Sequence, residues 1–121
     1  ADPAGIETIL LVGPITADAR LRAACRHSRG YVYGVNLMGV TGERADLGEA
    51  AEALARRLKA ATDLPVLMGF GVSGPEQAEA LAAVADGVIV GTAIVRRILA
   101  GESPEQVHRF VASLRAALDA A

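Results

Sequence analysis

Several residue types are scarce in this chain of 121 residues, and each scarcity excludes a class of protein. The chain has no tryptophan, 3% aromatic residues and a formal net charge of −2. A nucleic-acid groove needs clustered lysine or arginine and stacking rings, so we expect no nucleic acid as a partner. The single cysteine, Cys25, excludes an internal disulfide framework and is typical of a reducing compartment.

Long apolar runs are also missing. The longest lie near residues 9–12 and 87–95, far short of the roughly 20 residues that a membrane-spanning helix needs. The first five residues, ADPAG, lack the basic and apolar regions of a signal peptide. We therefore expect a cytoplasmic protein that does not bind membranes.

What the chain does have is a regular alternation of apolar runs and amphipathic segments. The four runs cover residues 8–13, 31–36, 65–70 and 87–91, and each is nearly continuous in apolar character, as in strands buried on both faces. Strand and helix repeated four times predict an α/β fold with parallel strands and right-handed crossovers. With 52% hydrophobic residues, the chain is predicted to form a single domain over 1–121.

Capping patterns predict where the helices begin and end. Four starts are expected at Thr16, at Asp46 with Glu49, at Ser73 with Glu76, and at Ser103. A short helix over residues 93–100 is expected to end at Gly101, because glycine readily adopts the left-handed conformation that closes a helix.

Two strand-to-helix passages, residues 66–76 and 86–95, point to a ligand. In each, an apolar run ends in a glycine, Gly71 or Gly91, where a helix begins. Bare backbone N–H groups and the positive end of a helix dipole attract phosphate at such a point. The alternative is that these glycines only permit tight turns, and that Thr92 is only a helix cap.

The same passages bear on the architecture. A small doubly wound sheet and part of a (β/α)₈ barrel both fit the alternation. Barrels frequently bind phosphate with the loops after strands seven and eight and the N-terminus of a short extra helix. Here the last two strands end in glycine and a short helix follows, so we favour a half-barrel that supplies the four C-terminal βα units of a TIM-type barrel.

Four motifs carry a resemblance to a known family. They are GYVY at 30–33, GVTG at 39–42, GFGVS at 69–73 followed by PEQ at 75–77, and VGTAIV at 90–95. In this order and spacing the chain resembles the C-terminal half of the tryptophan synthase alpha subunit. The resemblance implies aldol cleavage of indole-3-glycerol phosphate to indole and glyceraldehyde 3-phosphate. It also implies transfer of indole to a beta subunit, which holds the pyridoxal phosphate, so no cofactor is expected in this chain.

The resemblance also assigns substrate-binding residues. The implied phosphate contacts are Gly42, Gly71, Gly91 and Thr92; the implied pocket around the rest of the substrate consists of Tyr33, Phe70 and Ile89, and Thr41 is the closing-loop threonine. No metal ligands are expected.

No catalytic residue is expected in the chain. By resemblance, the catalytic glutamate and aspartate of the family lie in the first half of its barrel. The four strand ends here offer Pro14, Asn36, Phe70 and Thr92, none of which is a carboxylate.

A half-barrel leaves two sheet edges and an apolar inner face that something must cover. The expected cover is the missing half of the same enzyme or a second copy of this chain in a homodimer, and a beta chain is a further expected partner. The alternative function is a non-catalytic, self-assembling scaffold that binds phosphate.

Overall fold

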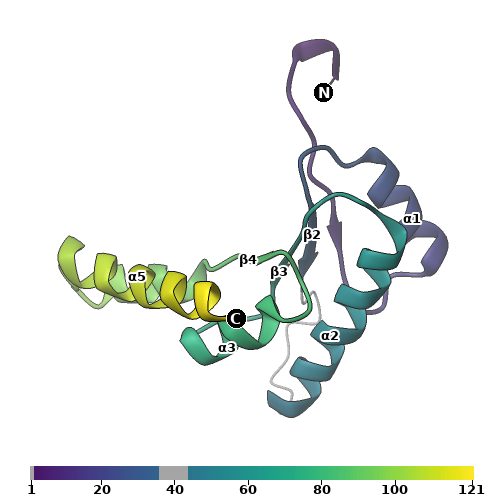
Figure 1. Ribbon diagram of the computed structural model, residues 1–121. Helices are drawn as coiled ribbons and strands as arrows, with labels where there is room; N and C mark the ends of the chain where they lie inside the picture. Colours follow the sequence, from purple (N-terminus) through teal and green to yellow (C-terminus); the bar gives the residue numbers. More distant parts are fainter. Residues whose placement is uncertain (1, 36–43) are drawn as a thin grey trace.

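The predicted parallel sheet is confirmed in the computed structural model, which describes residues 2–35 and 44–121 (Figure 1). The strands are β1 (Leu11–Val12), β2 (Val32–Val35), β3 (Val66–Gly69) and β4 (Gly87–Val88). They form one sheet in the order β1-β2-β3-β4, and every neighbouring pair is parallel.

Helices connect the strands, which confirms the α/β class. They are η1 (Asp2–Ala4), α1 (Asp18–His27), α2 (Arg44–Ala61), α3 (Pro75–Ala82), α4 (Thr92–Leu99) and α5 (Pro104–Ala120). In Figure 1, α1 and α2 lie together on one side of the strands, while α5 extends away from the sheet and packs against α3. None of the described helices is both long and apolar enough to cross a membrane.

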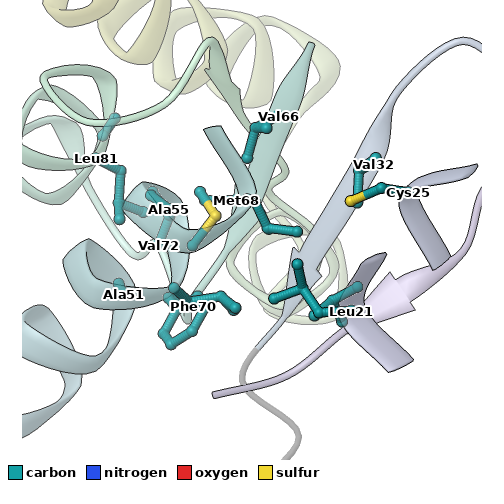
Figure 2. Packing of buried hydrophobic residues seen from close by; sticks show 14 of the residues in the cluster. Leu21, Cys25, Val32, Ala51, Ala55, Val66, Met68, Phe70, Val72 and Leu81 are labelled. Carbon is teal, nitrogen blue, oxygen red and sulfur yellow. The ribbon is translucent and has the colours of Figure 1, made fainter. Parts of the chain in front are cut away.

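The core lies on one face of the sheet. Val12, Val32, Val66 and Met68 project from that face and are fully buried against helical side chains such as Leu58 (Figure 2). Burial alternates along β2 and β3, as expected for a pleated strand.

The opposite face of the sheet is open. Leu11 is 52% exposed, and Tyr33 and Leu67, its neighbours in register, are half-buried. The expectation that the strands are buried on both faces is therefore wrong for the described residues. The apolar side chains that made the runs look continuous lie on a face that no described helix covers.

Three predicted caps differ from the structure. Ala17 is the N-cap of α1, and the hydroxyl of Thr16 instead accepts a hydrogen bond from the Gly13 N–H at 3.0 Å, closing the turn after β1. Helix α2 begins at Arg44, so Asp46 lies inside the helix rather than at its cap.

The cap of α3 is shifted by one residue from Ser73 with Glu76 to Gly74 with Gln77. The side-chain oxygen of Gln77 accepts hydrogen bonds from the N–H and hydroxyl of Ser73 and from the N–H of Gly74, at 2.6–3.1 Å. Because Gln77 reaches back over the helix start, the serine donates to it rather than capping the helix.

The predicted end of α4 and the predicted start of α5 are confirmed. The hydroxyl of Ser103 accepts a hydrogen bond from the Gln106 N–H at the start of α5. Gly101, with a φ of +84°, closes α4. The Gly101 N–H donates to the Ile98 carbonyl, and the Glu102 N–H donates to the Arg97 carbonyl. These two bonds form a Schellman motif.

Arg97 joins α4 to α5. Its guanidinium lies 3.8 Å from the centre of the Phe110 ring and donates to the Glu102 carboxylate at 3.1 Å. The ring is buried in the core, so this contact fixes α4 against a rigid neighbour.

Asp86 fixes the edge of the sheet where the strands begin. Its carboxylate accepts hydrogen bonds from the Val66 N–H at 2.8 Å and from the Lys59 ammonium at 2.9 Å. These bonds stabilise the charged form, and the lysine foremost holds the pKa of the Asp86 carboxyl below its ordinary value of 3.8.

We predict that Asp86→Asn lowers the free energy of unfolding by about 1 kcal/mol at neutral pH, because a neutral amide accepts these bonds more weakly. A carboxyl with a lowered folded-state pKa stabilises the fold above its unfolded-state pKa, and this contribution disappears as pH falls through the folded-state value. The variant and wild-type stabilities should therefore converge in acid. Urea unfolding over a pH series measures this, with Asp63→Asn as a control. A gap that stays constant across the acid range would contradict the prediction.

Candidate phosphate-binding site

The two glycine turns lie at the same edge of the sheet. In the parallel register Met68 pairs with Val88, and Gly71 and Gly91 each follow three residues later. The strands are adjacent and point the same way, so their turns leave the sheet side by side. The structure thus brings together the two passages that the sequence had singled out.

The turn after β3 depends on glycine. Gly71 has a φ of +67°, a conformation that L-residues with a side chain adopt only at a cost. It is exposed, and a Cβ added there would meet no atom within 4 Å. The following residue, Val72, is buried and anchors the turn to the core.

The turn after β4 leads directly into α4. Gly91 is the N-cap, so the alternative in which Thr92 caps the helix is wrong; Thr92 is the first helical residue. The N–H groups of Ile94 and Val95 donate to the Gly91 carbonyl. The N–H groups of Thr92 and Ala93 are first-turn donors, which a helix cannot satisfy internally.

The surroundings of this helix start suit an anion. No side chain caps it, and its first turn has no acidic residue. The positive end of the α4 dipole therefore faces the space beside Gly71 and Gly91 without a competing carboxylate from its own helix.

Two of the pocket residues lie on the open face of the sheet. Tyr33 packs over Gly69, where an added Cβ would lie 2.6 Å from the phenol oxygen and 2.7 Å from Cε2. Ile89 lies between Val88 and Val90, which both pack against the core, so by strand alternation it points to the open face.

The other pocket residue, Phe70, lies elsewhere. It belongs to the buried cluster on the helix-covered side, where Figure 2 draws it with Ala51, Met68 and Val72. Thr41 and Gly42, to which the resemblance assigned loop and phosphate contacts, lie outside the described residues.

The sequence analysis missed an acid at the edge where the strands end. Asp18 begins α1, and Arg57 of α2 donates to its carboxylate at 2.8 Å and to the Pro14 carbonyl at 3.1 Å. Chiefly through this hydrogen bond, the arginine lowers the pKa of the Asp18 carboxyl. The group is therefore held in its charged form as an ion-pair partner, unsuited to donating a proton near neutral pH.

Two open hollows in the described surface lie away from the glycine turns. One of them, of about 260 Å³, lies between α1 and α2 and is lined by Asp18, Leu21, Arg22, Arg57, Ala60 and Ala61. Within residues 2–35 and 44–121, no three histidine, cysteine or acidic side chains gather as metal ligands would. Cys25 is buried in the core, and this burial raises the pKa of its thiol.

Comparison with known proteins identifies the family. The family described as "Tryptophan synthase alpha chain" matches residues 1–121. The chain belongs to the tryptophan synthase alpha chain family. The tryptophan synthase alpha chain of Streptomyces coelicolor is 50% identical over 99 residues, which are 82% of this chain and 36% of that protein. That of Geobacter sulfurreducens is 40% identical over an alignment of 121 positions, which covers 98% of this chain and 46% of that protein.

Solved structures of tryptophan synthase show the same fold. One from Mycobacterium tuberculosis matches with a TM-score of 0.83 and 38% identity, over 97% of this chain and 44% of that one. The tryptophan synthase α2β2 complex of Pyrococcus furiosus matches with a TM-score of 0.82 and 36% identity, over 95% and 48%. The four parallel strands thus match part of the alpha-chain TIM barrel, and the chain spans less than half the length of the curated relatives it matches.

We predict that Gly71→Ala lowers the free energy of unfolding by about 1–2 kcal/mol more than Gly91→Ala does, because only Gly71 has a positive φ. Both variants add one methyl group into open space and lose similar freedom in the unfolded chain, so they form a matched pair. Urea unfolding of the two variants measures the difference. Equal stabilities would show that the turn relaxes without strain.

Proposed function

We propose that this chain is the C-terminal half of the tryptophan synthase alpha barrel, folded as a single domain over residues 1–121. In this proposal it binds indole-3-glycerol phosphate during cleavage of that substrate to indole and glyceraldehyde 3-phosphate. The observation that supports this most strongly is the position of Gly71 and Gly91 at the ends of two adjacent parallel strands, beside the uncapped start of α4. This arrangement fits a phosphate site built by the last two loops of a barrel.

Each residue has a defined part in the proposal. The amides of the Gly71 and Gly91 turns and the hydroxyl of Thr92 hold the phosphate, because a dianion accepts several N–H and O–H bonds at a helix start. Tyr33 and Ile89, on the open face, contact the rest of the substrate. Phe70 supports the Gly71 turn from the buried side. The roles of Thr41 and Gly42 rest on the resemblance alone.

The chemistry requires a second component. The catalytic glutamate and aspartate of the family are assigned to the other half of the barrel, so this chain contributes binding and orientation, not proton transfer. We propose that the partners are that half-barrel and, as in the α2β2 complex of Pyrococcus furiosus, a beta chain. We also propose a cytoplasmic location, consistent with a single reduced cysteine.

We predict that the chain binds glycerol 3-phosphate and that Thr92→Val weakens this binding about tenfold. The substitution keeps the shape of the side chain and removes one hydrogen bond to a charged group, worth roughly 1.5 kcal/mol or more. Titration calorimetry or phosphorus NMR measures the affinity. Thr8→Val, the same chemical change at an exposed site before β1, serves as the control. Absence of saturable binding, or an equal loss in both variants, would contradict the site.

We predict no release of indole from indole-3-glycerol phosphate by this chain alone. Release should begin when the complementary part of a full-length relative is added, because that part supplies the carboxylates. Activity of the isolated chain would contradict the division of roles. If phosphate binds but the supplemented chain never releases indole, the scaffold function is favoured instead.

A further inference from the structure

Helices α3 and α4 begin differently, although each follows a strand that ends at the same edge of the sheet. At α4 the N-cap is Gly91, no side chain caps the helix, and the first turn has no acidic residue. At α3 the N-cap is also a glycine, Gly74, but the first turn contains Glu76, and the side chain of Gln77 reaches back over the helix start. The two helix starts therefore offer an anion different surroundings.

The backbone N–H groups that precede α3 already have an acceptor. The side-chain oxygen of Gln77 accepts from the Ser73 N–H at 2.7 Å, from the Gly74 N–H at 3.1 Å and from the Ser73 hydroxyl at 2.6 Å. Pro75, the next residue, has no N–H to donate. Three consecutive positions thus leave no N–H group for a ligand, and the Glu76 carboxylate repels an anion from the first turn.

We propose that Gln77 is a positioning residue that directs a phosphate to the start of α4. Its oxygen occupies the donors at the start of α3, so the first-turn amides of Thr92 and Ala93 are the ones offered to the ligand. The inference rests on the phosphate site of the proposed function and deepens it, because it names the residue that selects between two neighbouring helix starts.

The neutral charge of Gln77 is part of the inference. Glutamate fills the same position of a capping box, since its carboxylate accepts the same bonds. The Gln77 oxygen is bonded to the N–H of Ser73, two residues after Gly71, so it lies within about 10 Å of Gly71. A negative charge there would repel a phosphate dianion, because the screening length is about 10 Å at 0.1 M salt. An amide caps α3 without this repulsion.

The chain contains a matched control at the start of α5. Gln106 occupies the same position in its own box, where its side-chain oxygen accepts from the Ser103 N–H at 2.7 Å. Both boxes contain the sequence PEQ, at 75–77 and 104–106. Gln106 lies beyond the C-terminal end of α4, whose eight residues span about 12 Å. Gln77→Glu and Gln106→Glu therefore make the same chemical change near the proposed phosphate and away from it.

The first measurement is the affinity of the intact chain for glycerol 3-phosphate, by titration calorimetry. We expect Gln77→Glu to weaken binding about threefold or more at roughly 0.1 M salt, and this loss should largely disappear at about 0.5 M, where the charges are screened. Gln106→Glu should stay within about 1.5-fold of wild type at both concentrations. Both variants keep a capping box, so their urea unfolding midpoints should match that of wild type. A purely structural role of Gln77 would give no salt-dependent difference between them.

Amide NMR tests the closure of the α3 start in the wild-type chain itself. On addition of glycerol 3-phosphate, the Thr92 and Ala93 resonances should shift, while those of Ser73 and Gly74 stay nearly unmoved. Gln77→Met keeps the length of the side chain and removes its oxygen, so in this variant the Ser73 and Gly74 resonances should respond as well.

Three results would overturn the inference while leaving the proposed function in place. They are equal binding by Gln77→Glu and Gln106→Glu at about 0.1 M salt, a wild-type response of Ser73 and Gly74 as strong as that of Thr92, and unresponsive Ser73 and Gly74 in Gln77→Met. In each of these cases the wild-type chain still binds the phosphate ester. Absence of any binding by wild type would instead defeat the proposed function and this inference together.

Discussion

The parallel pairing of β3 with β4 is the interaction on which the candidate site depends. The Asp86 N–H donates to the Val66 carbonyl at 2.9 Å, and the Asp86 carboxylate accepts from the Val66 N–H. Backbone and side chain together thus fix the register where the two strands begin. Because side chains alternate along a strand, a slip of one residue would move Gly91 out of line with Gly71 and turn Ile89 to the helix-covered side.

The unequal faces of the sheet explain how part of a barrel can have a core of its own. All the largest buried side chains lie between the sheet and the helices on one side, including Leu54 and Leu58 of α2. Among the described residues, that core forms without side chains from the open face of the sheet, where Leu11 and Tyr33 remain accessible. The open face of the sheet is therefore not needed to form this core, and its exposed apolar area is typical of a surface that binds further polypeptide or a ligand.

Much of this arrangement could be predicted from the sequence, because strand alternation and glycine-ended runs are local signals. Ser103 was correctly predicted as a cap. Its hydroxyl accepts from the Gln106 N–H, while the Gln106 side chain accepts from the Ser103 N–H and leaves the hydroxyl available. Ser73 was not, because Gln77 reaches back and takes its hydrogen bonds. The burial of Phe70 follows from the same alternation, because it lies two residues after Met68 and so on the helix-covered face. The ion pair of Asp18 with Arg57 joins residues 39 apart in sequence and has no signature in local spacing.

The eight residues of α4 carry both the uncapped first-turn amides at Thr92 and the exposed apolar side chains of Ile98 and Leu99. A short helix with no fully buried residue has little stability of its own, so whatever orders one end also orders the other. Ligand affinity and half-barrel association would then be thermodynamically linked, each raising the other by the same factor. In such a molecule, assembly itself would set how tightly a ligand is held at the start of α4.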